Sequence, residues 1–425
     1  MSRRWLAVLL SITLWSDVAI AAEPAATGPA GCLTPGLEPF NAAMTRLLHE
    51  WGLPGGSLAV SHNGRILLVR GYGLADKATG APVTPRTRFR LGSLSKPITA
   101  VAILKLVEEG RLGLDDKMLP LLGDLAPPGE AIRDPRVHAI TVRHLLQHTA
   151  GFDREMSGDP VFMPRAAAAL ERQKAKPPPS CQTVLRNVLD GPLDFDPGAQ
   201  HAYSNLGYCI LGRIIERVAG TPYVEFAQSR LLQLAGASGL MLGRTMTAAP
   251  DEATYYDYAG APTQEGMPGV AEGMVPAPYG AFAIEEMDAY GGWIGAPVDY
   301  LRFMLAIDGQ GGPRLLKEAS VREMLSRPEI PGATPGQPIF YGLGMYVRDL
   351  GGGAKNWWHT GYQPGFFTFA LRTERGHSWA VAFNSSPRDR GGFWRDLDSS
   401  LWAAAIRVGQ WPTSSRSCAP YDPKH

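Results

Sequence analysis

The 425-residue chain lacks an excess of charge of either sign: 41 basic and 40 acidic residues leave a net charge of +1. A nucleic-acid-binding protein normally carries a large basic surplus on one face, so this balance argues against that class. No apolar run of about 18 residues occurs beyond the N-terminus, which excludes an internal membrane span. The chain also contains no C-x-x-C, H-E-x-x-H or G-x-S-x-G pattern. We therefore expect no metal, no cofactor and no serine elbow of the α/β-hydrolase kind.

The composition is that of a globular protein, with 45% hydrophobic and 19% charged residues. At about 150 residues per domain, the length predicts one large domain or two to three smaller ones. The 49 glycines and 36 prolines indicate long ordered loops.

The N-terminus reads as an export signal that is removed from the mature protein. Arg3 and Arg4 form a charged start, Trp5–Trp15 is mostly apolar, and Ala19-Ile20-Ala21 offers a cleavage site. We expect residues 1–21 to be cleaved and the protein to be periplasmic or secreted, without an integral membrane segment. Ser2-Arg3-Arg4 leaves the twin-arginine route open beside the general one.

Predicted strands lie at both ends of the chain, and the middle is mostly helical. His62-Asn63-Gly64 is a strong type I′ hairpin signal. The predicted strands are Ser57–Ser61, Ile66–Gly71, Tyr341–Val347, Phe366–Leu371 and Ser378–Phe383, the last two being joined by a tight turn at Thr373–Gly376. The predicted helices are Phe40–Trp51, Ala100–Glu109, Val142–His148, Leu206–Ala219, Tyr223–Leu234 and Phe393–Val408.

This distribution predicts an α/β (α+β) fold: one antiparallel sheet built from both chain ends, flanked by helices, with a helical domain inserted. The expected domains are 22–125 with 285–425, and the insertion 126–284. Four cysteines in an exported chain are compatible with two disulfides, and three pairings are open. A sheet that joins the two ends would bring Cys32 near Cys418 and leave Cys181 to pair with Cys209.

Ser93-Leu94-Ser95-Lys96 is the first motif that could carry chemistry, and it precedes a predicted helix. Positions i and i+3 share a helical face, so the Ser93 hydroxyl and the Lys96 amine would be neighbours. A serine hydroxyl is a poor nucleophile until a base accepts its proton, and a desolvated lysine can do so. The backbone N–H of Ser93, at a helix start, is free to point at an oxyanion.

Two further motifs lie downstream. Tyr203-Ser204-Asn205 offers a phenol for proton transfer and an amide that could orient a substrate carbonyl. His359-Thr360-Gly361 precedes a strand, and the small residue Gly361 would let a substrate lie along the strand edge. The N–H of Tyr362 could complete an oxyanion hole with that of Ser93.

Taken together, these motifs resemble the serine β-lactamase-related superfamily, which contains class C β-lactamases, DD-peptidases and family VIII esterases. The resemblance rests on order and spacing, extends over roughly residues 38 to 410, and is specific to the superfamily rather than to a substrate. The residues that carry it are Arg88–Lys96, Ile140–Gly151, Tyr203–Asn205 and His359–Gly361, supported by Gly291–Trp293, Asp299–Phe303 and Tyr341–Gly344.

The resemblance implies a β-lactamase/transpeptidase-like fold and a serine hydrolase that forms an acyl-enzyme on Ser93. Lys96 and Tyr203 would assist proton transfer, and which of them is the base stays open, because two coupled groups titrate as a pair. Asn205, His359, Thr360 and Gly361 would contact a small ester, amide or lactam substrate.

One departure concerns the third motif, in which the superfamily usually has K-T-G and this chain has His359. A histidine is mostly neutral at pH 7 and supplies little charge for a substrate carboxylate. We therefore expect weak binding of penicillins and an esterase- or peptidase-like activity. The alternatives are a class C-like β-lactamase, an acyltransferase, or a non-catalytic protein that binds peptidoglycan fragments.

Overall fold

The computed structural model describes residues 28–126, 132–331, 336–414 and 418–421. The predicted export signal, residues 1–21, lies outside the described residues. No helix in the described ranges is both long and apolar enough to span a membrane.

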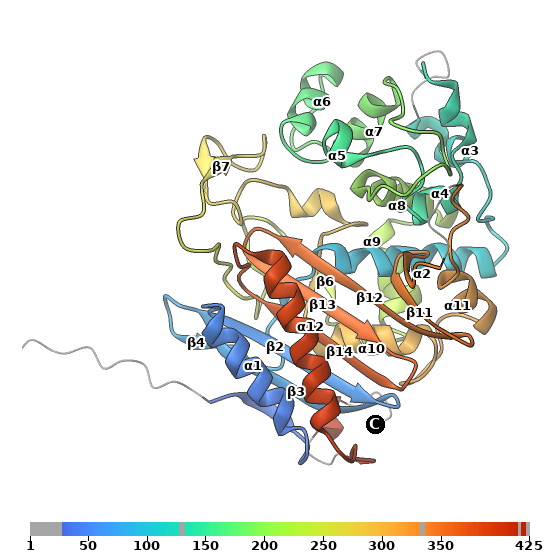
Figure 1. Cartoon of the computed structure of the whole chain (residues 1–425). Coiled ribbons are helices and arrows are strands. Elements are labelled where there is room, and N and C mark those ends of the chain that lie inside the picture. The colour runs from blue at the N-terminus through green and yellow to red at the C-terminus, as the bar shows by residue number, and fades with distance from the viewer. Residues whose placement is uncertain (1–27, 127–131, 332–335, 415–417, 422–425) are drawn as a thin grey trace, which may run out of the picture.

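A large antiparallel sheet forms the centre of the molecule, and its strands come from both ends of the chain (Figure 1). The strand order is β1-β3-β2-β14-β13-β12-β11-β10, and the short β4 pairs with β3. The pairing of β2 with β14 joins the N-terminal strands to the C-terminal ones. The strands are β1 Ala30–Leu33, β2 Gly55–His62, β3 Arg65–Asp76, β4 Ala81–Pro82, β10 Ile339–Tyr341, β11 Tyr346–Gly351, β12 Ala354–Gln363, β13 Phe366–Arg372 and β14 His377–Phe383.

The hairpin between β2 and β3 has the predicted turn. Asn63 and Gly64 both have positive φ, 49° and 75°, and His62 pairs with Arg65. Two positive φ angles define a type I′ turn, whose twist matches that of the flanking strands.

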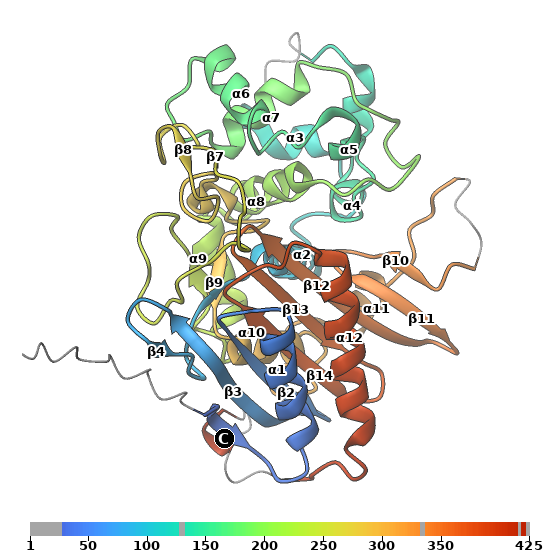
Figure 2. The same cartoon turned by 60° about the vertical axis from the view of Figure 1, so that its left-hand side comes forward.

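Helices cover both faces of the sheet, and each face has its own apolar core. Helices α1 (Glu38–Glu50) and α12 (Arg390–Arg407) pack side by side on one face (Figures 1 and 2). Helices α2 (Ser95–Glu108) and α10 (Pro297–Ile307) lie on the other. The predicted fold class is therefore confirmed.

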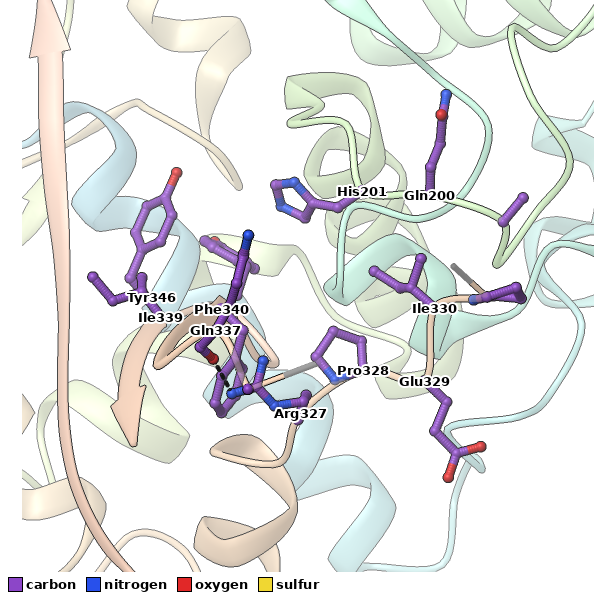
Figure 3. Close-up of a pocket in the computed structure, with 14 residues that line it drawn as sticks. Gln200, His201, Arg327, Pro328, Glu329, Ile330, Gln337, Ile339, Phe340 and Tyr346 are labelled. Carbon is purple, nitrogen blue, oxygen red and sulfur yellow. Dashed lines mark hydrogen bonds between the residues drawn. The ribbon is translucent and has the colours of Figure 1, made fainter. Parts of the chain in front are cut away.

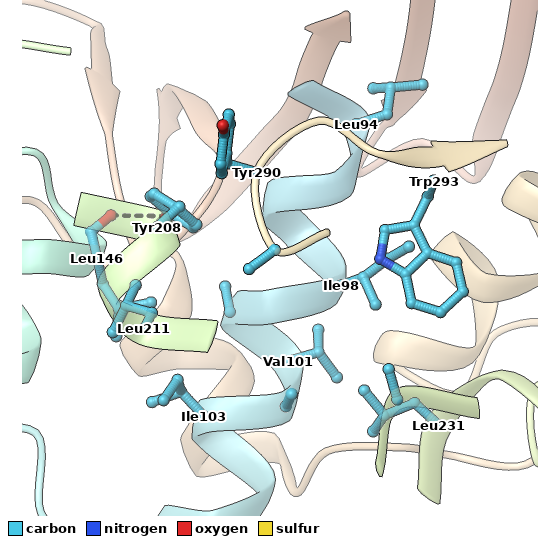
Figure 4. Close-up of a cluster of buried hydrophobic side chains, with 14 of the residues drawn as sticks. Leu94, Ile98, Val101, Ile103, Leu146, Tyr208, Leu211, Leu231, Tyr290 and Trp293 are labelled. Atoms are coloured by element: carbon cyan, nitrogen blue, oxygen red, sulfur yellow. Dashed lines mark hydrogen bonds between the residues drawn. The ribbon is translucent and has the colours of Figure 1, made fainter. Parts of the chain in front are cut away.

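Helix α2 is buried on all sides. Residues Ala100 to Leu104 follow one another without a polar side chain, and a helix that is apolar all round belongs in a protein interior. Figure 4 shows Ile98 on the side of Trp293, with Tyr208 and Leu211 on the opposite side of the helix. This packing holds the N-terminus of α2 in a fixed position.

The remaining elements lie mostly in a helical layer beyond α2 and in the loops around it (Figure 2). One apolar core runs through this layer and the sheet side of α2, and the domain boundaries at residues 125 and 284 stay predictions. The helices are α3 Met118–Leu122, α4 Val142–Leu146, α5 Arg154–Ser157, α6 Arg165–Gln173, α7 Cys181–Leu189, α8 Asn205–Ala219, α9 Tyr223–Ala227 and α11 Glu318–Met324; the short strands are β5 Phe89–Arg90, β6 Met241–Leu242, β7 Gln264–Glu265, β8 Met274–Val275 and β9 Trp293–Gly295.

Several predicted elements have other limits in the structure, among them the helix expected to begin at Ala100, which begins at Ser95. The strand expected over Tyr341–Val347 is wrong: β10 ends at Tyr341 and β11 begins at Tyr346, because Gly344, at φ 86°, lies in a turn. The helix expected to reach His148 ends at Leu146, and His148 itself has a φ of 58°. The helix expected to reach Leu234 is α9 followed by a π-helical turn over Gln228–Leu232.

Both disulfides lie within the described residues. Cys32 is bonded to Cys418 with a Cα–Cα distance of 5.3 Å, and Cys181 to Cys209 with one of 5.8 Å. The first pair ties β1 to the C-terminal segment, and the second ties α7 to α8.

Candidate active site

Ser93 sits in a single 3₁₀ turn, Gly92–Leu94, that leads directly into α2. Gly92 has a φ of 54°, a conformation that favours glycine. A hydrogen bond from α10 stabilises the turn, since the Tyr300 hydroxyl donates to the Leu94 carbonyl at 2.9 Å. Ser93 is half-buried and lines a cleft of about 380 Å³.

Lys96 lies one helical turn after Ser93, and its side chain is completely buried. Its Nζ lies 3.0 Å from Ser93 Oγ, and it donates to Asn205 Oδ1 at 2.7 Å and to the Tyr290 carbonyl at 3.0 Å. Burial lowers the pKa of Lys96 well below its ordinary value, although the nearby Asp159 carboxylate opposes this shift. A lysine of lowered pKa in contact with a serine hydroxyl can accept its proton.

Tyr203 lies against the same lysine. The centre of its ring is 4.8 Å from Lys96 Nζ and 4.7 Å from the guanidinium carbon of Arg154. Burial raises the pKa of Tyr203 well above its ordinary value, while the adjacent Ser93 hydroxyl works against that rise. The buried Tyr203 hydroxyl makes no hydrogen bond of normal geometry to the described residues. At neutral pH it is therefore a phenol with a proton to donate.

Asn205, the first residue of α8, connects Lys96 to a carboxylate that the sequence did not reveal. Its Oδ1 accepts from Lys96 Nζ, and its Nδ2 donates to Asp159 Oδ2 at 2.6 Å. Asp159 lies in the loop between α5 and α6, and burial raises its pKa. The sequence carries no motif around Asp159. The contact arises only in the folded chain, because Asn205 lies 46 positions further along.

Strand β12 passes directly beside the Ser93 turn. A Cβ on Gly361 would overlap the carbonyl oxygen of Leu91, so the glycine admits the protein's own backbone rather than a substrate. The Tyr362 nitrogen lies near Gly92, at 3.1 Å from where a Cβ of that residue would be. Because antiparallel residues alternate in hydrogen bonding and Gln363 closes the turn to β13, the N–H of Tyr362 points away from β13. The N–H groups of Ser93 and Tyr362 thus belong to adjoining segments of the same cleft wall.

His359 lies behind the cleft wall, with 1% of its surface exposed. Its Nδ1 is 2.7 Å from the Thr360 carbonyl, which can only accept, so Nδ1 carries the proton. Its Nε2, at 3.0 Å from the Tyr341 hydroxyl, then accepts from it. Burial, with a smaller effect of the Lys96 charge, lowers the pKa of His359 to about 3. Both ring nitrogens are thus engaged inside the protein, and the expected contact of His359 with substrate stays a prediction that this arrangement does not favour.

Thr360 points to the opposite face of β12. It lines a hollow at the start of α12 that adjoins the Ser93 cleft, since Tyr362 and Arg390 line both. Alternate residues of a strand face opposite sides, so the side chains of His359 and Thr360 point away from each other.

Two arginines line the cleft, and sequence analysis missed both. Arg154 belongs to α5, and Arg390 begins α12 with its guanidinium carbon 4.1 Å from the centre of the Tyr362 ring. Positive charge therefore reaches the cleft from these two residues. The expected weak binding of penicillins stays a prediction, and it considered His359 without these two arginines.

A larger hollow of about 930 Å³ lies at β10 and the start of β11 (Figure 3). His201, Phe340 and Tyr346 line it. Arg327 lines it too, and its guanidinium donates to the Gln337 carbonyl. Ser93 and Lys96 do not line it, but Tyr341, whose hydroxyl bonds to His359, does. Among the described residues, no group of three or more His, Cys, Asp or Glu side chains is placed to hold a metal ion.

Three comparisons with known proteins each found proteins that are similar to this chain. A family model described as "Beta-lactamase" matches residues 40–399. The chain is 29% identical over 332 residues to a protein of Dichelobacter nodosus named for fimbrial assembly (FimD, serogroup D), covering 76% of this chain and 73% of that protein. It is 29% identical to Esterase EstB of Burkholderia gladioli, covering 80% and 86% respectively. The solved D-amino acid amidase of Ochrobactrum anthropi SV3 is 25% identical with a TM-score of 0.66, covering 87% of this chain and 99% of the amidase.

Proposed function

Because the chain belongs to the beta-lactamase family, we propose that it is a serine hydrolase that carries the acyl group of a small ester or amide on Ser93. One observation carries the proposal: Ser93 Oγ lies 3.0 Å from a lysine amine that is completely buried and whose pKa is lowered. The similarity to an esterase and to an amidase supports the choice of ester and amide substrates.

In this mechanism Lys96 is the base and Tyr203 the acid. Neutral Lys96 takes the proton from Ser93 Oγ, which attacks the carbonyl carbon and forms a tetrahedral intermediate. The N–H groups of Ser93 and Tyr362 donate to the oxyanion. The bond to the leaving group then breaks, and Tyr203 supplies its proton, which Lys96 replaces. The opposite pKa shifts of the two side chains support this division of roles.

Water then attacks the acyl-Ser93 carbonyl and restores the serine hydroxyl. An alcohol or amine acceptor in place of water would make the protein an acyltransferase, and added acceptors in the assay separate the two.

A class C-like β-lactamase is a second candidate because Arg154 and Arg390 line the cleft. Their guanidinium groups could pair with the carboxylate of a lactam, a role that His359 cannot fill. A non-catalytic binding protein would instead be acylated once, or not at all.

The deciding experiment is the intact mass of the protein after reaction with a fluorophosphonate, with peptide mapping and Ser93→Ala as control. The same sample is assayed on p-nitrophenyl butyrate and on a chromogenic cephalosporin. We expect one adduct on Ser93 and turnover of the ester. A folded protein without an adduct would contradict the proposed mechanism.

We also propose that the protein is exported to the periplasm or secreted. Two disulfides support an oxidising compartment. The N-terminal sequence of protein recovered from outside the cytoplasm should begin at Ala22, and an intact N-terminus there would contradict cleavage.

A further inference from the structure

The side-chain amide of Asn205 is held between a cation and a carboxylate. Its oxygen accepts from Lys96 Nζ at 2.7 Å, and its nitrogen donates to Asp159 Oδ2 at 2.6 Å. Lys96 and Asn205 are buried and Asp159 is half-buried at the cleft, so water does not compete freely for the bond between Lys96 and Asn205.

The two ends of an asparagine amide have nearly the same shape but opposite hydrogen-bonding roles. If the amide turned over, its NH₂ group would face the Lys96 amine, and two donors would meet. A carboxylate only accepts, so Asp159 binds the NH₂ end and disfavours that orientation. Asp159 is held in turn by the N–H of Val161, which donates to its other oxygen at 3.3 Å.

We infer that Asp159 is a positioning residue for acyl transfer, which fixes the Asn205 amide so that its oxygen holds Lys96 beside Ser93. The inference rests on the proposed function. Asp159 acts through Asn205, and the second N–H of the Asn205 amide stays available to a substrate carbonyl.

Asp159 also acts on Lys96 by its charge. The carboxylate raises the pKa of Lys96 against the dominant effect of burial, and the Arg154 guanidinium lowers it. Removing the charge of Asp159 should lower the pKa of Lys96 further, so the acid limb of the pH–rate profile should move to lower pH. The titratable and charged groups around Lys96 are Arg154, Asp159, Tyr203, Tyr208, Tyr290, His148 and His359.

Two substitutions separate the hydrogen bond from the charge. Asp159→Asn keeps an acceptor oxygen for Asn205 and loses the charge, whereas Asp159→Ala loses both. Glu171→Gln is the matched control, because it removes a negative charge from an exposed side chain on helix α6 that does not line the cleft.

The measurement is kcat and KM for p-nitrophenyl butyrate from pH 5 to 9, with thermal melts of each variant. We expect Asp159→Ala to lower kcat by about 30- to 100-fold with little change in KM, because the Asn205 amide then no longer holds the Lys96 amine beside Ser93. Asp159→Asn should stay within about tenfold of wild type and shift the acid limb to lower pH. Glu171→Gln should change neither kcat nor the pH of the acid limb.

The inference is overturned if Asp159→Ala matches wild type, or if it lowers only thermal stability while kcat and the acid limb stay unchanged. If Asp159→Ala does not fold, an unmoved acid limb in Asp159→Asn overturns it. In each case, fluorophosphonate labelling of Ser93 in the wild type would leave the proposed function standing. If the wild type is not labelled, both the proposed function and the positioning role of Asp159 are refuted.

Discussion

The buried neutral His359 should make the stability of the protein depend on pH, and His359→Gln should remove part of that dependence. An unfolded histidine titrates near pH 6.5, whereas His359 in the folded protein has a pKa of about 3. Between these values the unfolded chain binds one more proton than the folded one. The free energy of unfolding therefore falls as the pH falls below about 6.5, and this loss continues to about pH 3.

The size of the effect follows from the two pKa values. At pH 7 the penalty for keeping His359 neutral is about 0.2 kcal/mol, and at pH 5 it is about 2 kcal/mol. Glutamine retains an acceptor for the Tyr341 hydroxyl and does not titrate. Between pH 7 and pH 5, wild type should therefore lose about 2 kcal/mol more unfolding free energy than His359→Gln.

Urea denaturation at both pH values, followed by tryptophan fluorescence, measures this difference. His148 and the other histidines contribute equally to both proteins and cancel. His138→Gln, at an exposed position, is the control. Its unfolding free energy should fall between pH 7 and pH 5 by as much as that of wild type. Equal losses in wild type and His359→Gln would refute the argument that His359 is neutral and enclosed.

Three further substitutions test the packing of the site and its support. Gly361→Ala should lower the free energy of unfolding by about 1–3 kcal/mol and slow labelling of the cleft serine, because the new methyl group overlaps the Leu91 carbonyl; an unchanged urea midpoint would contradict this. Removing the disulfide between Cys181 and Cys209, 28 positions apart, by a double change to serine should cost about 3–4 kcal/mol in the same assay, and a loss near zero would show that the bridge does not constrain the unfolded chain. Tyr203→Phe should lower kcat by about 10²- to 10⁴-fold with little change in the melting temperature, because the buried hydroxyl that it removes makes no hydrogen bond of normal geometry to the described residues. A lower melting temperature with unchanged kcat would assign Tyr203 to structure alone.

The sequence by itself determined the fold class and the local chemistry. Alternating strands and the Asn63-Gly64 turn are local signals, and they predicted the hairpin of β2 and β3 correctly. Ser93 and Lys96 are adjacent because a helix places positions i and i+3 on one face. Such inferences succeed because they depend only on residues close together in the chain.

The tertiary structure decided which side chains face the cleft. Asp159, Arg154 and Arg390 carry no recognisable motif, and they reach the site only because loops and helix starts converge on it. The tertiary structure also engages both ring nitrogens of His359 inside the protein and places Thr360 at a hollow that adjoins the Ser93 cleft. The neutral state of His359 is likewise a result of burial, which desolvates the charged imidazolium and which no neighbouring residue in the sequence could reveal.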